Sequence, residues 1–282
     1  MDQQNVRQVV REGYARVARQ GSSCCGPSRS CCGGASVAES VSKQIGYSDE
    51  EISSVPEGAN LGLGCGNPVA LASLKEGEVV LDLGSGAGFD CFLAAARVGA
   101  SGKVIGVDMT PEMLERARAN ARRGGYTNVE FRLGEIESLP VADSSVDVVI
   151  SNCVINLSPD KQRVFAEAFR ALKPGGRLMI SDIVLLKQLP PKVRDSVAAY
   201  VGCLAGALMK DEYLSAIGSA GFQDITVAEE TSYPVDGLLS GASGDSIFGE
   251  LGLTPEQAQD IAGSIASIKV SAIKANARCC CG

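Results

Sequence analysis

Short apolar runs alternate with amphipathic stretches through the middle of the chain. The runs, each of a length suited to a buried strand, cover residues 79–83, 103–109, 129–135, 145–153 and 177–184. The stretches between them predict helices at 90–98 and 111–123, and a third that is capped at 158–160 and runs to residue 172. Such alternation is typical of right-handed crossovers, so we expect an α/β fold with a doubly wound, mostly parallel sheet.

The two ends of the chain add further elements to this central region. Helical periodicity predicts helices over 3–20, 190–208 and 211–220. Residues 224–230 and 267–275 predict a closing antiparallel strand pair. We therefore divide the chain into a cysteine-rich helical and loop segment (1–74), a ligand-binding core (75–185) and a C-terminal region that completes the sheet and the substrate site (186–282).

Composition and charge exclude several classes of function. The 282 residues carry a net charge of −7, and the longest basic run is Arg122-Arg123, which argues against a nucleic-acid partner. No apolar stretch approaches the roughly 20 residues that span a bilayer, and the polar start lacks a signal peptide's apolar core, so we expect a cytoplasmic protein without membrane contact. The chain has no histidine, which excludes a histidine base, a histidine zinc ligand and a Ser-His-Asp triad.

The turn after the first apolar run carries the strongest functional signal. It reads Asp82-Leu-Gly84-Ser85-Gly86-Ala-Gly88 and leads into a helix, so its backbone can approach a ligand closely. A dinucleotide site usually reads G-x-G-x-x-G and binds a pyrophosphate, which Asp82 would repel. The same carboxylate would attract a cation, and S-adenosylmethionine (SAM) carries an α-ammonium and a sulfonium. The pattern therefore favours a SAM-binding loop.

The ends of the next two strands offer further groups to a nucleoside. Asp108, followed by Met109, ends the second strand at the spacing from Gly84 expected of a carboxylate that binds both ribose hydroxyls. Glu135 and Ile136 follow the third strand, where they would lie beside an adenine ring. A solvated charge and a core contact are equally good interpretations of these two residues. Because ligands of doubly wound sheets bind at the carboxyl ends of the strands, we expect these groups on one rim.

Eleven cysteines are unusual in such a chain. In a reducing compartment most of them would serve as thiols for metal, metalloid or redox chemistry. Two adjacent pairs, Cys24-Cys25 and Cys31-Cys32, lie in a Gly/Ser/Pro-rich stretch, and three more cysteines end the chain at 279–281. Incidental thiols in flexible segments, or less readily a zinc site, would also explain these groups.

Four single cysteines lie nearer to the predicted ligand site. Cys65 stands between two glycines, Cys153 ends the fourth strand, and Cys203 borders the apolar stripe of the 190–208 helix. Each has a plainer interpretation, as a small turn residue or a packing residue, because free cysteine is commonly buried. Cys91 begins the helix after the glycine turn, where the helix N-terminus would make it reactive, although packing is the simpler role.

Taken together, these cysteine contexts resemble one family. The sequences that carry the resemblance are Gly64-Cys65-Gly66, Asp90-Cys91, Ser-Asn-Cys-Val-Ile-Asn-Leu at 151–157 and Gly-Cys-Leu-Ala-Gly-Ala-Leu at 202–208. With the core from residue 78 to about 184, they resemble the arsenite methyltransferases of the class I SAM-dependent methyltransferase superfamily. The resemblance extends to about residue 222 and implies a Rossmann-like methyltransferase sheet with an antiparallel C-terminal strand pair.

The resemblance also implies roles for particular residues. Trivalent arsenic would be held by thiolates at Cys65, Cys153 and Cys203. An N-terminal cysteine, for which we favour Cys32 or Cys31, would pair with Cys65. The family positions that would hold SAM are Asp82, Gly84, Asp108, Glu135 and Ile136. Ser85, Gly86 and Met109 lie in the same loops and would also contact SAM.

The implied reaction needs no base. Arsenic(III) is thiophilic, and three thiolates leave its lone pair free to attack the SAM methyl group, which agrees with a chain without histidine. Methyl transfer oxidises the arsenic formally to As(V), and thiols can return it to As(III) while they form a disulfide. Turnover on arsenite or methylarsenite would therefore require an external thiol reductant of the glutathione or thioredoxin type.

Two other functions would also use a SAM-like loop. One is methylation of a small organic acceptor, such as a quinone or sterol-like carbon, which leaves the cysteine positions unexplained. The other is a non-catalytic thiol protein that sequesters metalloid, against which the intact Asp82 and Asp108 argue.

Overall fold

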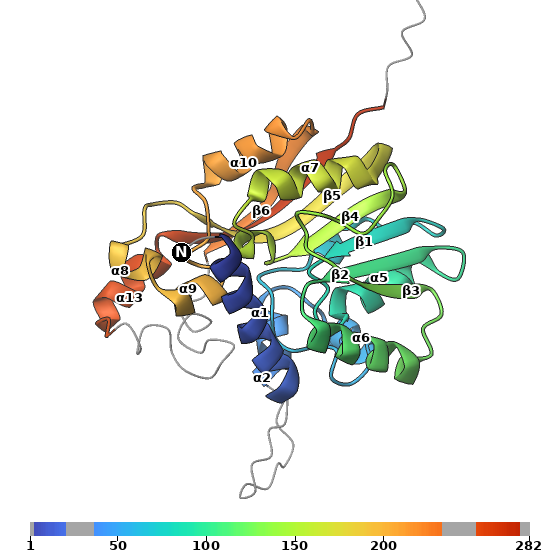
Figure 1. Cartoon of the computed structure of the whole chain (residues 1–282), viewed down its shortest axis with the longest axis horizontal. Coiled ribbons are helices and arrows are strands. Elements are labelled where there is room, and N and C mark those ends of the chain that lie inside the picture. Colours follow the sequence, from blue (N-terminus) through green and yellow to red (C-terminus); the bar gives the residue numbers. More distant parts are fainter. Residues whose placement is uncertain (1–2, 21–36, 233–251, 277–282) are drawn as a thin grey trace, which may run out of the picture.

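The computed structural model describes residues 3–20, 37–232 and 252–276 and contains a seven-stranded sheet with helices on both faces (Figure 1). The strands follow the order β3-β2-β1-β4-β5-β7-β6. Their bounds are β1 Val79–Leu83, β2 Lys103–Asp108, β3 Val129–Leu133, β4 Val146–Asn152, β5 Leu172–Leu185, β6 Gln223–Ser232 and β7 Ile265–Ile273. Strands β1 to β5 pair in parallel, whereas β7 pairs antiparallel with both β5 and β6. The predicted doubly wound sheet with an antiparallel C-terminal pair is confirmed.

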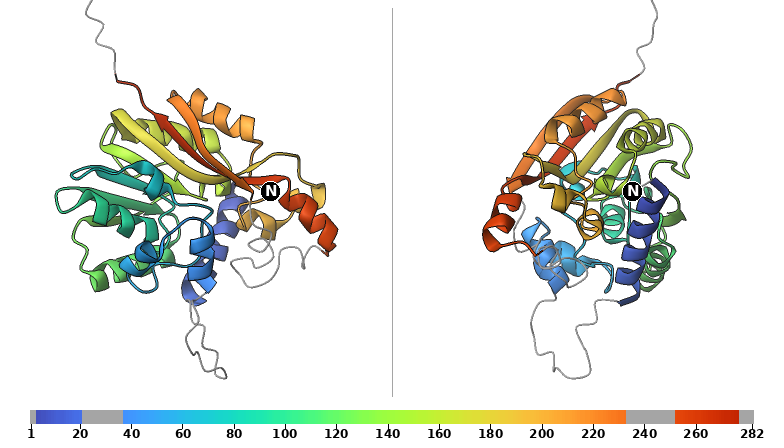
Figure 2. Two further views of the ribbon diagram at one scale, coloured as in Figure 1. Left: turned by 180° about the vertical axis from the view of Figure 1, so that it is seen from behind. Right: turned by 60° about the vertical axis from the view of Figure 1, so that its left-hand side comes forward.

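The helices cover the sheet and its carboxyl edge. The longer ones are α1 Gln3–Gln20, α2 Val37–Gln44, α5 Phe89–Val98, α6 Pro111–Gly124, α7 Lys161–Ala171, α10 Lys210–Ser219 and α13 Pro255–Ala262. The shorter ones are α3 Asp49–Ser54, α4 Pro68–Ala72, α8 Pro191–Arg194, α9 Val197–Val201 and the 3₁₀ turn η1 Ile155–Leu157. Helix α1 contacts both α6 and α9, so the start of the chain lies across the rim of the sheet (Figure 2).

Alternate residues of the central strands pack on opposite faces. In β1, Leu81 and Leu83 join a core with α7 and α10, whereas Val80 joins a second core with α5 and α6. This explains why β1 is apolar at four of its five positions, since both faces of the sheet are covered there.

The prediction of a single helix over 190–208 is wrong. The chain forms α8 and α9, and a turn follows in which Cys203 has φ +63°. That left-handed conformation cannot continue a helix. Gly206 then approaches the Asn156 carbonyl so closely that a Cβ would lie 2.1 Å from its oxygen. The fifth strand also begins earlier than predicted, at Leu172.

The described helices include none that is long and apolar enough to cross a membrane.

Candidate active site

The glycine loop after β1 is fixed to the end of β2 by backbone hydrogen bonds. Gly84 and Ser85 donate to the Val107 carbonyl oxygen (2.8 and 3.0 Å), and Gly86 donates to Asp108 Oδ2 (2.9 Å). Gly84 (φ +69°) requires glycine, since a Cβ would lie 2.4 Å from the Val154 side chain. Asp108 therefore shapes the loop, and its other oxygen accepts from the Thr110 N–H at 2.8 Å.

Asp82 lies beneath this loop rather than on its surface. The residue is 2% exposed, and the Cys91 thiol donates to its Oδ2 at 3.1 Å. Burial, together with the charge of Asp90, raises the pKa of Asp82. Cys91 is fully buried, and burial raises the pKa of its thiol well above the ordinary value, so packing is confirmed as its role over reactivity.

A buried polar network joins the Cys65 loop to the end of β4. Asn152 accepts from the Cys65 N–H (3.1 Å) and donates to the Gly66 carbonyl (2.9 Å) and to Asp90 (3.0 Å). Tyr47 donates to Asp90 at 2.6 Å. Burial raises the pKa of Asp90 to about 6, against the lowering effect of these two donors.

The glycines beside Cys65 allow this close approach. A Cβ on Gly64 would lie 2.9 Å from the Asn152 amide, and one on Gly66 would lie 1.7 Å from Ser181 Oγ. The two glycines therefore let the backbone on either side of Cys65 approach Asn152 and Ser181 closely. The Cys65 thiol lies 3.4 Å from the Ser181 carbonyl oxygen, to which it donates.

The three predicted arsenic ligands converge although they come from distant parts of the chain. Cys65, Cys153 and Cys203 pack in one cluster, and the Cys203 thiol donates to the Cys153 carbonyl oxygen at 2.9 Å. Cys153 and Cys203 both have left-handed backbone, with φ +56° and +63°. Conformations of this kind in non-glycine residues cluster at functional sites.

The pKa values of all three thiols are raised, which favours the protonated form. Burial raises the pKa of Cys65. The pKa of Cys203 is raised by its contact with Cys153 and then by burial. For Cys153, a hydrogen bond with Cys203 lowers the pKa. The hydrogen bond with Cys65 and burial raise the pKa by more than this, so the pKa of Cys153 is raised overall.

Asp182 joins this group, and the sequence analysis missed it. One of its carboxylate oxygens lies within 4.8 Å of the Cys65 and Cys153 sulfurs. Asn156 Nδ2 (2.9 Å) and the Ile183 N–H (2.8 Å) donate to Oδ1, and the Tyr213 hydroxyl donates to Oδ2 at 2.9 Å. Burial raises the pKa of Asp182 to about 6. The sequence did contain a signal for Asp182, because an acidic residue within the apolar run at 177–184 is unusual.

Helix α1 supplies another residue that the sequence analysis missed. The Tyr14 hydroxyl lies 3.9 Å from Cys203 Sγ, and Tyr14 packs against the thiol cluster together with Met109. Arg7 and Arg11 of the same helix pair with Glu135 at 3.4 and 3.5 Å.

These contacts bear on the two interpretations of the turn after β3. Ile136 is 8% exposed and belongs to the core on the α7 face. Glu135 is held by helix α1 rather than solvated alone. Contact of either residue with adenine stays a prediction.

Seven of the cysteines lie outside the described residues, and the predictions made for them stay predictions. They are Cys24, Cys25, Cys31, Cys32 and the cysteines at 279–281.

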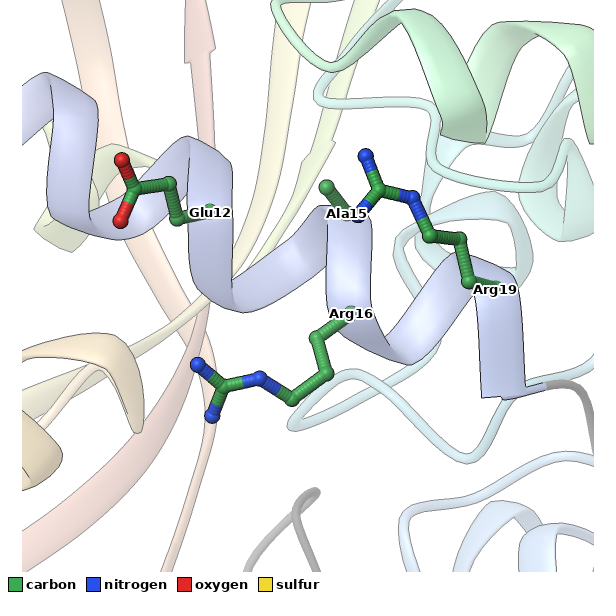
Figure 3. A pocket seen from close by; sticks show the side chains of 4 residues that line it. All are labelled: Glu12, Ala15, Arg16 and Arg19. Atoms are coloured by element: carbon green, nitrogen blue, oxygen red, sulfur yellow. The ribbon is translucent and has the colours of Figure 1, made fainter.

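A surface cavity of about 400 Å³ lies along α1, where Glu12, Ala15, Arg16 and Arg19 line it (Figure 3). Its described lining includes none of the predicted site residues. The thiol cluster is therefore a separate feature of the molecule.

Comparison with known proteins gives a consistent result. Residues 74–221 match the family model of a methyltransferase domain. The arsenite methyltransferase of Halobacterium salinarum is 51% identical over 234 residues, which are 80% of this chain and 60% of that protein. The arsenite methyltransferase of Homo sapiens is 40% identical over 168 residues, which are 56% of this chain and 44% of that protein. The chain thus spans about half the length of the curated relatives it matches.

A solved structure agrees with these relatives. The arsenic(III) S-adenosylmethionine methyltransferase of Chlamydomonas reinhardtii matches with a TM-score of 0.62 at 35% sequence identity. The match covers 85% of this chain and 74% of that one.

Proposed function

This chain belongs to the arsenite methyltransferase family, and we propose that it transfers methyl groups from SAM to trivalent arsenic bound by Cys65, Cys153 and Cys203. The observation that carries the proposal is the convergence of these three thiols in one cluster, which includes Val154, the residue that Gly84 of the glycine loop packs against. Three thiols in one cluster suit arsenic(III), because this soft ion prefers sulfur ligands. A methyltransferase for an organic acceptor would have no use for them.

The residues at the glycine loop fit SAM. A Cβ on Gly86 would point into open space, so the loop leaves room for a ligand beside its backbone. The Asp108 carboxylate is held rigidly by two N–H groups and can accept further hydrogen bonds from ribose hydroxyls. A cationic ligand above Asp82 would favour the ionised carboxylate and offset the burial that raises its pKa. When bound, SAM supplies an electrophilic methyl group.

The protonated thiols suit arsenite as the incoming species. Each As–OH group exchanges with one Cys–SH group, so that one As–S bond forms and one water molecule leaves with the thiol proton. Three exchanges convert As(OH)₃ into a neutral tris-thiolate complex with no net release of protons. The raised thiol pKa values therefore impose no cost on arsenite binding near neutral pH.

We place the reducing step in the same site. Methylated arsenic in the formal +5 state returns to +3 when two thiols give up two electrons and form a disulfide. Cys32 or Cys31 is our candidate for the partner of Cys65 in that disulfide. An external thiol of the glutathione or thioredoxin type would then reduce the disulfide, and the site could accept arsenite or methylarsenite again.

A methylation assay tests the proposal. Purified chain, SAM, arsenite and a thiol reductant should yield methylated arsenic species, detected by chromatography coupled to elemental mass spectrometry. Cys153→Ser and Cys203→Ser should each abolish the product while SAM binding, measured by calorimetry, is retained. Cys280→Ser, which removes a thiol from the tail, is the matched control. Full activity in either site variant would show that the ligands are misassigned.

A further inference from the structure

Two of the three thiols lie in a compact cluster with a carboxylate. The Cys65 sulfur, the Cys153 sulfur and an oxygen of Asp182 all lie within 4.8 Å of one another. Cys65 and Asp182 are buried. Cys203 contacts Cys153 but is not a member of this set; its thiol donates to the Cys153 carbonyl oxygen and lies near the Tyr14 hydroxyl. The preformed donor set is therefore two sulfurs and one oxygen rather than three sulfurs.

This donor set suits a different ion from arsenic. Zinc and cadmium bind cysteine sulfur and carboxylate oxygen together, commonly with four ligands in a tetrahedron. A tetrahedral centre with metal–sulfur bonds of about 2.3 Å places two sulfurs about 3.8 Å apart, so small side-chain movements would close the cluster on a metal. Trivalent arsenic takes three thiolates and has no need of the carboxylate.

We propose that Cys65, Cys153 and Asp182 form a binding site for a divalent thiophilic cation such as zinc or cadmium. This site overlaps the arsenic site, so a bound cation excludes arsenite. A water molecule completes the four ligands. Because the cation and arsenic share Cys65 and Cys153, each excludes the other. The inference goes beyond methyl transfer, since it requires neither SAM nor turnover.

The surroundings of Asp182 support a ligand role. Oδ1 accepts two hydrogen bonds, from Asn156 and Ile183, whereas Oδ2 accepts one, from Tyr213. Oδ2 therefore keeps one acceptor position, and the carboxylate is oriented by hydrogen bonds in the way that metal-binding carboxylates usually are.

The charge balance also fits. Two thiolates and a carboxylate exceed the charge of a divalent cation by one negative charge. The Lys161 ammonium interacts electrostatically with Asp182 and is held by the carbonyls of Asn156 (3.3 Å) and Ser158 (2.8 Å). A positive charge therefore faces the site where the excess negative charge would arise.

Cadmium titration tests the inference. The full chain is used with serine in place of the cysteines outside the described residues, so that Cys65, Cys91, Cys153 and Cys203 remain. With a phosphine as reductant, the cadmium–thiolate absorption in the ultraviolet should saturate at one cadmium per chain. Asp182→Asn should weaken cadmium binding at least about tenfold, which is the effect that loss of a supporting group has at other metal sites, and should weaken arsenite binding far less.

Cys203→Ser is the reciprocal variant. It should abolish arsenite binding and leave the cadmium affinity unchanged, because Cys203 is not a member of the preformed set. Equal cadmium affinity in Asp182→Asn and the parent chain would overturn the inference. So would a Cys203→Ser chain that binds cadmium as weakly as Cys153→Ser does.

A spectroscopic measurement avoids any effect of substitution on folding. X-ray absorption of the parent chain with one bound cadmium should show two sulfur neighbours together with oxygen neighbours. A shell of three or four sulfurs without oxygen would exclude Asp182 and refute the site. Absence of cadmium binding while arsenite still binds would overturn this inference alone, whereas loss of arsenite binding would count against the proposed methylation.

Discussion

Two of the site cysteines have a backbone conformation that disfavours any side chain. Left-handed φ places the Cβ of Cys153 and Cys203 close to the following carbonyl oxygen. Such residues cost of order 1–3 kcal/mol each, and the surrounding contacts must hold them in place. At Cys203 one such contact is visible, the hydrogen bond of its thiol to the Cys153 carbonyl. The contacts around the thiol cluster therefore stabilise a backbone that would otherwise relax.

A comparison of two variants isolates this strain. At ordinary helix or strand positions alanine is more stable than glycine, but at φ +63° the order should reverse. Cys203→Gly should therefore be more stable than Cys203→Ala by about 1 kcal/mol, although both lose the thiol. Urea denaturation of the two variants measures the difference. A more stable alanine variant would show that the turn relaxes and stores no strain.

Asp90 gives a pH dependence of known sign. Its pKa is about 6 in the folded chain, above the value of an unfolded aspartate, so the folded state binds the proton more tightly. The stabilisation is complete below about pH 4 and is lost as the pH rises through 6. Asp90→Asn removes this dependence. Between about pH 4 and 7 the parent should lose on the order of 3 kcal/mol relative to the variant, at about 1.4 kcal/mol per pKa unit.

Urea denaturation at several pH values checks this expectation for Asp90. The lost hydrogen bond between Asn152 and the replaced oxygen shifts the stability of Asp90→Asn by a constant, so the slope with pH is the relevant quantity. Identical slopes in the parent and Asp90→Asn would mean that Asp90 is ionised at little cost in the fold.

At the scale of elements, local pattern predicted most of the architecture. The central strands are apolar because both faces are covered, and this signal was strong enough to predict the sheet. The helix predicted over 190–208 failed because the chain turns at Cys203 to meet residues distant in sequence. Tyr14 and Asp182 were missed for a related reason. Their partners lie far along the chain, and periodicity carries no information about such contacts.

The Gly-Cys-Gly loop allows a test at this scale. Gly66→Ala would place a Cβ 1.7 Å from Ser181 Oγ and 2.9 Å from Ser181 Cβ, which are buried in β5. The loop must shift, and Cys65 must shift with it. Because displacement of a binding group by about 1 Å has large effects, arsenite binding should weaken at least tenfold, whereas SAM binding should be retained. Calorimetric titration with arsenite and with SAM measures the two affinities.

Two further variants serve as controls for Gly66→Ala. Ser181→Gly removes the obstructing atoms and should restore arsenite binding in the double variant. Gly218→Ala in α10 places its Cβ in ordinary contact, 3.5 Å from Ile225, and should leave both ligands unaffected. Unchanged arsenite affinity in Gly66→Ala would show that the loop is not tightly placed.

At the scale of the whole molecule, the proposed arsenic site joins three separate parts of the chain. Cys65 precedes the sheet, Cys153 ends β4, and Cys203 follows α9, 50 residues beyond Cys153. In the unfolded chain these thiols would have to close long loops to meet, which costs entropy. Arsenite bound at the proposed site would therefore act as a cross-link that forms far more readily in the folded state than in the unfolded state.

Arsenite should therefore raise the melting temperature. At 100 times its dissociation constant, a ligand that binds the folded state alone stabilises it by about 2.7 kcal/mol. The chain with serine at the cysteines outside the described residues avoids arsenite binding to adjacent thiols in the unfolded state, which would reduce the effect. Cys65→Ser in that background should abolish the shift, because two thiols hold arsenic less tightly than three. A shift of equal size in Cys65→Ser would place the arsenic elsewhere in the molecule.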